Sequence, residues 1–129
     1  MKARYTVALS LLAGAALGAV SVGGLYAQGK APGAYVVIDI SEMKDPALFK
    51  TLLPKAGPSM APYGAHNVIR TEKIEALDGT PPKRFIVIAF DNAEKAKAWD
   101  ASAATKEITA IRQKSTTSRA FIVDGDAGN

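Results

Sequence analysis

The chain has no cysteine, and it has only one histidine and one tryptophan among its 129 residues. The absence of cysteine excludes disulfides, thiolate metal ligands, a cysteine nucleophile and a lipid-modified N-terminal cysteine. With His66 as the single histidine, a metal site would depend on carboxylates alone. The sequence also lacks a glycine-rich phosphate loop after a strand and the serine elbow of hydrolases. It therefore predicts neither a metal site nor a cofactor.

A large surplus of one charge is also lacking. The formal net charge is +4. Without Lys2 and Arg4, which lie in a segment that we expect to be removed, fourteen basic residues remain against twelve acidic ones. Such a small surplus, without interleaved aromatic residues, argues against nucleic-acid binding. Apolar residues make up 48% and charged residues 22% of the chain, which is typical of one soluble domain with a modest core.

The N-terminal segment has the pattern of a signal peptide over residues 1–27. Lys2 and Arg4 precede an uncharged stretch rich in Ala, Leu and Gly, and Ala27 offers a cleavage site. A flexible lead-in follows over 28–33. The alternative is an uncleaved anchor, because about 20 apolar residues can span a bilayer. Both readings place the domain outside the cytoplasm, periplasmic or secreted, and cleavage would leave it without membrane contact.

The first half of the domain predicts a strand and then a helix. Alternation over 34–40 places Val36, Ile38 and Ile40 on one strand face and Tyr35, Val37 and Asp39 on the other. Asp45 followed by Pro46 is a favourable helix start.

Three prolines disturb the predicted helix after its start. Pro54, Pro58 and Pro62 recur every four residues, and a proline inside a helix costs about 3 kcal/mol. We therefore expect the helix to kink or stop near Leu53, with a looser segment running on to Tyr63 and Gly64 as its C-terminal cap.

The second half predicts a hairpin, more helix and a last strand. A strand over 65–70, bending on to Leu77, is joined by Gly- and Pro-rich turn residues to a strand over 85–90. That third strand is apolar throughout, which predicts that both its faces are covered. Asp91 and Glu94 have the spacing of a capping box, and the following helix has an apolar stripe of Ala96, Trp99 and Ala103. After a break over 102–105 come a further helical turn or two, a strand over 120–123 and a disordered polar tail over 124–129.

This order of elements predicts an α+β fold of the ferredoxin-like type, βαββαβ, with a four-stranded antiparallel sheet. Several short motifs fall in the order and spacing of the domain-of-unknown-function 1330 family, which the domain over 34–125 resembles. They are Asp45-Pro46, Tyr63-Gly64, Leu77-Asp78-Gly79, Pro81-Pro82-Lys83-Arg84, Ala98-Trp99, Ser118-Arg119 and Val123-Asp124-Gly125. The resemblance implies a dimeric α+β barrel, in which the sheets of two copies pack face to face as a homodimer.

His66 and Asp39 are the candidate catalytic residues. His66 could act as a general base that Asp39 orients from an adjacent strand. The alternative is a surface histidine with an ordinary hydrogen bond. Asp39 interrupts an apolar strand and should be paired, with Arg70, Arg84, Arg119 or a hydroxyl. It is either a substrate-orienting group or part of a structural pair.

Tyr35, Arg70 and Trp99 are the candidate ligand-binding residues. In a regular strand, Arg70 lies on the same face as His66, so that both could line a pocket with Tyr35. The arginine would hold an anionic group by a bidentate contact. Trp99 lies in the apolar stripe of its helix, so a core position is the alternative to a ligand platform.

Three functions fit the sequence, which leaves open whether the protein is an enzyme. The first is a secreted homodimeric domain that binds a small molecule or has a structural role. The second is a cofactor-independent enzyme resembling the monooxygenases and isomerases of the same superfamily, acting on a small apolar substrate. This link is an analogy of fold. The third is a pure assembly module.

Overall fold

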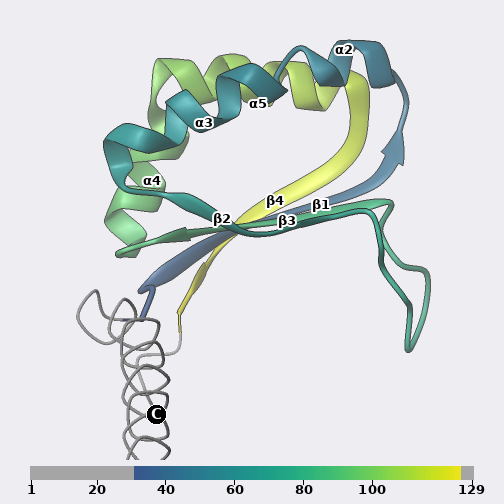
Figure 1. Ribbon diagram of the computed structural model, residues 1–129, viewed down its shortest axis with the longest axis horizontal. Helices are drawn as coiled ribbons and strands as arrows, with labels where there is room; N and C mark the ends of the chain where they lie inside the picture. The colour runs from purple at the N-terminus through teal and green to yellow at the C-terminus, as the bar shows by residue number, and fades with distance from the viewer. Residues whose placement is uncertain (1–30, 126–129) are drawn as a thin grey trace, which may run out of the picture. The chain divides into compact units, whose positions relative to one another are not determined.

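The computed structural model describes residues 31–125. The predicted leader over 1–27, most of the lead-in and the end of the tail therefore lie outside the described residues. The elements follow in the order β1 (Ala34–Met43), α2 (Pro46–Lys50), α3 (Leu53–Met60), η1 (Ala61–Tyr63), β2 (His66–Thr71), β3 (Arg84–Phe90), α4 (Ala93–Ala101), α5 (Ala103–Ser115) and β4 (Thr116–Asp124) (Figure 1).

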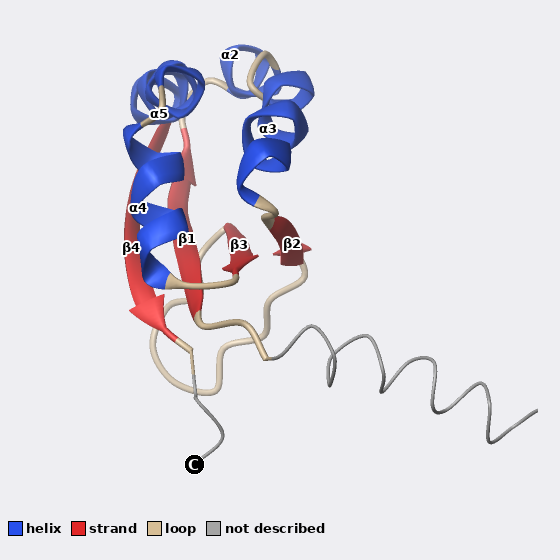
Figure 2. Cartoon of the chain, turned by 90° about the vertical axis from the view of Figure 1, so that its left-hand side faces the viewer, coloured by secondary structure: helices blue, strands red, loops and turns tan. Residues whose placement is uncertain are grey.

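The strands form one antiparallel sheet in the order β2-β3-β1-β4. The helices lie together on one face of this sheet, as Figures 1 and 2 show from two sides. The crossover between β1 and β2 consists of α2, α3 and the 3-10 helix η1, and the crossover between β3 and β4 consists of α4 and α5. This is the α+β ferredoxin-like fold that the order of elements predicts.

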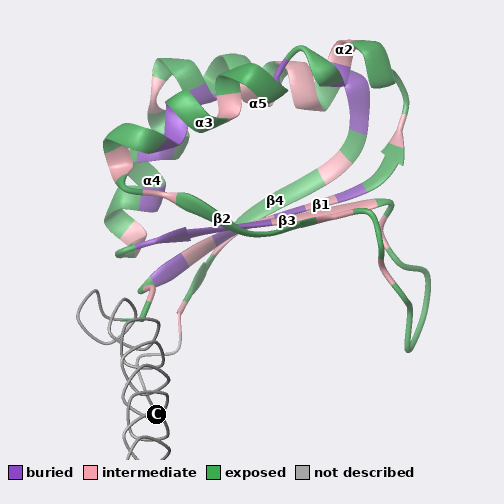
Figure 3. Cartoon of the chain, in the orientation of Figure 1, coloured by how far each residue is buried: buried purple, intermediate pink, exposed green. Residues whose placement is uncertain are grey.

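The core lies between the sheet and the helices. Val36, Ile38 and Ile40 on β1 point into it and are at most 9% exposed, as their alternation predicts. Phe90 and Trp99 complete its centre, with ring centroids 5.5 Å apart. Figure 3 shows buried positions in β1 and β3 and on α3 and α4. The opposite face of the sheet, which we call the open face, has no helix against it within residues 31–125.

The first crossover begins as predicted, but its second half is more regular than expected. Asp45 caps α2 by accepting a hydrogen bond from the backbone N–H of Leu48 at 3.1 Å. The helix stops at Lys50. The expected looser segment is wrong. Helix α3 begins with Pro54 in its first turn, where proline leaves no hydrogen bond unmade, and it continues past Pro58, which lies inside it. Gly64 ends the crossover with φ of +64°, the left-handed cap that the sequence predicts.

Strand β2 is shorter than expected and contains a bulge. It pairs with β3 as the predicted hairpin, but it ends at Thr71 and does not run on to Leu77. The chain opposite its expected continuation holds Pro81 and Pro82, which have no N–H to donate to a ladder. A register shift between Asn67 and Ile69 marks the bulge.

The second helical crossover has the expected break, but the break is confined to Ser102. This residue ends α4 with an extended backbone and caps α5 by accepting from the N–H of Thr105 at 3.3 Å. The break changes the helical phase, so Thr105 is buried and the predicted stripe residue Ala103 is exposed. Helix α5 and strand β4 are both longer than predicted, and Asp124 belongs to β4 and not to the tail.

Asn92, and not Asp91, caps helix α4. The Asn92 backbone is extended and its Oδ1 accepts from the N–H of Lys95 at 2.8 Å, whereas Asp91 forms a surface ion pair with the Lys95 ammonium at 3.0 Å. The cap therefore lies one residue after the predicted Asp91, and the predicted capping box is wrong, because Lys95 and not Glu94 is the third residue of the helix. A carboxylate and an amide are both good caps, and the turn after β3 decides which one reaches the free N–H groups.

Substituting Asn92 with alanine should lower the free energy of unfolding by about 1 kcal/mol, because it removes the cap of α4. Asp91→Ala is the matched control, and it should change stability by less than about 0.5 kcal/mol, since exposed ion pairs contribute little. Urea unfolding of both variants makes the comparison. A larger effect for Asp91→Ala would contradict the assignment of the cap.

Candidate functional site

A cavity of about 90 Å³ lies on the helix-covered face of the sheet. Helix α3 borders it on one side and α4 and α5 on the other, as Figure 2 shows for the helices. Its walls are mainly apolar and include Val36, Ile38, Ile86 and Ile88 from the sheet, Phe49, Leu52 and Met60 from the first crossover, and Trp99 and Ile108 from the second. This volume exceeds the roughly 10–15 Å³ that one water needs, so the space suits a small molecule.

Trp99 is both a core residue and part of the cavity wall. Its side chain is 6% exposed, and its indole N–H donates to Ser59 Oγ at 3.2 Å. Ser59 in turn donates to the carbonyl of Ala56 at 2.6 Å. The two alternatives for Trp99 are thus compatible, since a buried aromatic can pack in the core and face a ligand with its ring.

The charged residues in the cavity lining are three arginines and one aspartate, Arg70, Arg84, Arg112 and Asp100. Arg84 is the most constrained of the arginines. Its side chain is 17% exposed, it donates to Glu72 Oε1 at 2.9 Å, and its guanidinium lies 5.5 Å from the centroid of the Phe49 ring. Its Nε is buried and has no hydrogen-bond partner within residues 31–125. An unpaired buried donor costs about 1–3 kcal/mol.

Arg112 reaches the cavity from α5. It donates to Ser118 Oγ on β4 at 2.7 Å. Burial lowers the pKa of Arg112, and the nearby negative charge of Asp100 partly opposes this effect. The guanidinium stays protonated at neutral pH, because the ordinary pKa of arginine is far above it. Arg112 is therefore a partly desolvated cation whose hydrogen bond goes to a neutral group.

The bulge in β2 separates Arg70 from His66. His66 on β2 and Tyr35 on β1 both pair with Ala89 of β3, one from each side. His66 and Tyr35 therefore lie on the same face of the sheet, the open face. Beyond the bulge, Arg70 pairs with Ile86 and faces the helices. The expectation that both lie on one face is wrong, because one extra residue in a strand exchanges the faces of all residues after it.

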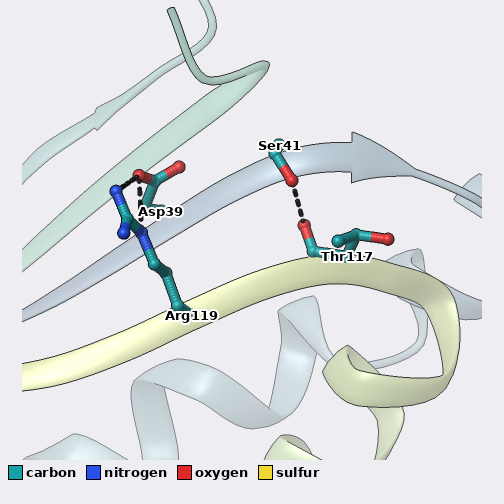
Figure 4. Close-up of polar contacts among 4 residues, drawn as sticks. All are labelled: Asp39, Ser41, Thr117 and Arg119. Carbon is teal, nitrogen blue, oxygen red and sulfur yellow. Dashed lines mark hydrogen bonds and ion pairs between the residues drawn. The ribbon is translucent and has the colours of Figure 1, made fainter.

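Asp39 is paired with Arg119, one of the partners expected for it. Figure 4 shows the Arg119 guanidinium of β4 reaching across to the carboxylate on β1, at 3.2 and 3.3 Å to Oδ2. Ser41 donates to the backbone carbonyl of Thr117 at 3.1 Å in the same region. These residues border an open hollow of about 610 Å³, which residues of the loop over 72–83 also line. The Asp39 carboxylate is 18% exposed, so the pair holds a half-buried charge in place.

The structure does not bring Asp39 and His66 together. Asp39 lies opposite Phe85 of β3 and His66 lies opposite Ala89, four residues further along. Four residues of a strand span about 13 Å, which is too far for the carboxylate to orient the imidazole.

The sequence missed Arg84 and Arg112 as site residues. For Arg84, the one available signal was its alternation with Ile86 and Ile88, which places it on the cavity face.

The open face of the sheet carries exposed apolar side chains. Ile69 is 44% exposed, Phe121 43% and Val123 38%, and their strand pairing places all three on this face. At the tip of the loop over 72–83, Leu77 is 99% exposed. Apolar side chains gathered on one face are typical of a surface that another protein covers.

Residues 31–125 contain neither a cluster of three metal-ligating side chains nor a helix long and apolar enough to cross a membrane.

The model of the family described as "Domain of unknown function (DUF1330)" matches residues 33–126. No curated protein matches the chain. Among solved structures, the fold is similar to that of RPA0582, a protein of unknown function from Rhodopseudomonas palustris, with TM-score 0.60, 12% identity, and coverage of 79% of this chain and 92% of that one. SnoaB, a cofactor-independent oxygenase from Streptomyces nogalater, has TM-score 0.52, 14% identity, and coverage of 74% and 95%. A protein from Caulobacter crescentus, described as a putative antibiotic biosynthesis monooxygenase, has TM-score 0.51, 14% identity, and coverage of 74% and 92%. At these identities the likeness shows the fold alone.

Proposed function

This chain belongs to the DUF1330 family of domains of unknown function, and on that premise we propose that it is a homodimeric domain that binds a small, partly apolar molecule. The observation that carries the proposal is the apolar cavity between the sheet and the helices. Ligand sites in proteins are mostly apolar cavities with a few polar groups that fix orientation. Arg84 and Arg112 supply those polar groups here.

The open face supports the homodimer. Helices cover the other face of the sheet, whereas Ile69 and Phe121 leave apolar surface exposed. A second copy packed face to face would cover both. Leu77, in the loop over 72–83, is a further uncovered apolar side chain. The leader pattern over 1–27 supports a further part of the proposal, that the mature domain works in the periplasm or is secreted.

Native mass spectrometry of the mature protein, purified from its own secretory compartment, tests the proposal. We expect a dimer with a reproducible small-molecule adduct. A cavity-filling variant locates the adduct. Ala120 lines the cavity, so Ala120→Leu should remove at least about nine-tenths of it by occupying the space of the ligand.

Ala98→Leu adds the same atoms at an exposed position on α4, outside the cavity lining, and should leave the adduct unchanged. An adduct that persists in Ala120→Leu would place the ligand elsewhere. A wild-type protein that neither carries nor takes up a small molecule would contradict the proposal and favour a pure assembly role.

The second candidate is a cofactor-independent monooxygenase- or isomerase-like enzyme. SnoaB, described as a cofactor-independent oxygenase, shares the fold, and the cavity would then hold the substrate. The candidate catalytic residues His66 and Asp39 do not support this function, because neither lines the cavity. Binding of a small molecule is therefore the function that the geometry supports better.

A further inference from the structure

We infer that the cavity selects a ligand with one anionic group on a small apolar body, such as a short aliphatic carboxylate, and that Arg84 and Arg112 receive the anion. The inference rests on the proposed binding function and names the chemical class of the ligand. It goes beyond the expected role of Arg70, because two other arginines occupy the same end of the cavity.

Strand pairing places these two arginines at one end of the cavity. Ile40 pairs with Arg84 on one side and with Ser118 on the other, so the three form one row across the sheet. Arg112 lies over this row, because it donates to Ser118 Oγ at 2.7 Å. The row spans two strand spacings, about 10 Å in all. Arg84 and Arg112 therefore flank the same buried position, Ile40, from β3 and from α5.

The positive charge at this end is not balanced by the residues that line it. Glu72, the acidic partner of Arg84, is itself 68% exposed, and it engages one guanidinium nitrogen. Arg112 has no ion pair within residues 31–125. Asp100 is the single carboxylate in the lining, against three arginines. Partly desolvated cations are stabilised by an anion that accepts their hydrogen bonds.

Arg70 adds a third positive charge beside this end. It pairs with Ile86, which places it diagonally next to Arg84 on the same face. Diagonal neighbours of this kind are about 7–8 Å apart. A cationic ligand would therefore meet repulsion from three directions.

The rest of the cavity fixes the apolar part of the ligand. Leu52, Ile88 and Trp99 offer apolar walls, and Ile88 lies four residues along β3 from Arg84. A ligand with several charges, such as a nucleotide, would place charge against these walls at a high desolvation cost. One anionic head on an apolar body matches both ends of the cavity.

The affinities of three ligands of the same chain length test this inference separately from the proposed binding function. The ligands are hexanoate, hexan-1-ol and hexylamine. Trp99 is the single tryptophan of the chain and lines the cavity, so its fluorescence reports binding to the mature protein. We expect hexanoate to bind at least about tenfold more tightly than hexan-1-ol, because its carboxylate forms charge-assisted hydrogen bonds. Hexylamine should bind most weakly.

Arg84→Gln and Arg112→Gln should each reduce the preference for hexanoate over hexan-1-ol severalfold, because each removes one of the two cations that receive the carboxylate. Arg119→Gln, on the open side of the sheet, is the matched control and should keep the preference. Equal affinity of the wild type for hexanoate and hexan-1-ol, or a preference for hexylamine, would overturn the inference and leave the binding function intact. If none of the three binds although the purified protein carries an adduct, the inference fails and the binding function stands; if the adduct is absent as well, both fail.

Discussion

Replacing Trp99 by alanine should lower the free energy of unfolding by about 3–5 kcal/mol. The indole is 6% exposed, packs against Phe90 and donates its N–H to Ser59. Removing it would join the vacated space to the existing cavity, because Trp99 forms part of the cavity wall. The loss is a large part of the 5–15 kcal/mol that stabilises a typical domain. Urea unfolding at a fixed protein concentration measures it.

Ser59→Ala separates the hydrogen bond from the packing. This variant keeps the Trp99 ring but leaves its buried N–H without the Ser59 acceptor, and should cost about 1–3 kcal/mol. A Trp99→Ala variant that loses less stability than Ser59→Ala would show that the ring is not a central core element.

Ile69→Asp should raise the dissociation constant of the proposed dimer by about 100-fold or more. Ile69 pairs with Val87, lies on the open face and is 44% exposed in one copy. A carboxylate there would be desolvated without a partner when two sheets meet, whereas it stays hydrated in the separated monomer. Sedimentation or light scattering across micromolar concentrations follows the change.

Ala104→Asp is the control for added negative charge. Ala104 is exposed in the first turn of α5, where an acidic residue is favourable, so this variant should stay dimeric. Circular dichroism should show that Ile69→Asp remains folded. A wild-type domain that is monomeric at micromolar concentration, or an Ile69→Asp dimer as tight as the wild type, would refute packing through the open face.

Local patterns predicted most of the fold. The alternation over 34–40 identified the face of β1 that is buried, and Asp45-Pro46 and Gly64 marked the limits of the first crossover. Each of these signals acts over a few neighbouring residues. Helix boundaries differ from the prediction where two neighbouring residues can both act as the cap. Asp91 and Asn92 are such a pair, and the turn after β3 decides which of their side chains caps α4.

The candidate site was less predictable, because it depends on contacts between distant segments. Arg112 and Ser118 meet only because α5 lies over β4, and Arg84 joins them only through its pairing with Ile40. No spacing along the chain relates these residues. Asp39 is the intermediate case, since its need for a partner was evident from the sequence but the choice of Arg119 was not.

The sequence by itself determined the fold class, the family and the core face of β1, because hydrophobic alternation, caps and turn residues act locally. Tertiary structure alone decided which polar residues share a surface. The bulge at β2 sends His66 to the open face and Arg70 to the cavity. The physical reason for this separation is the pairing of β2 with β3. An extra residue in β2 exchanges the faces of all residues beyond it.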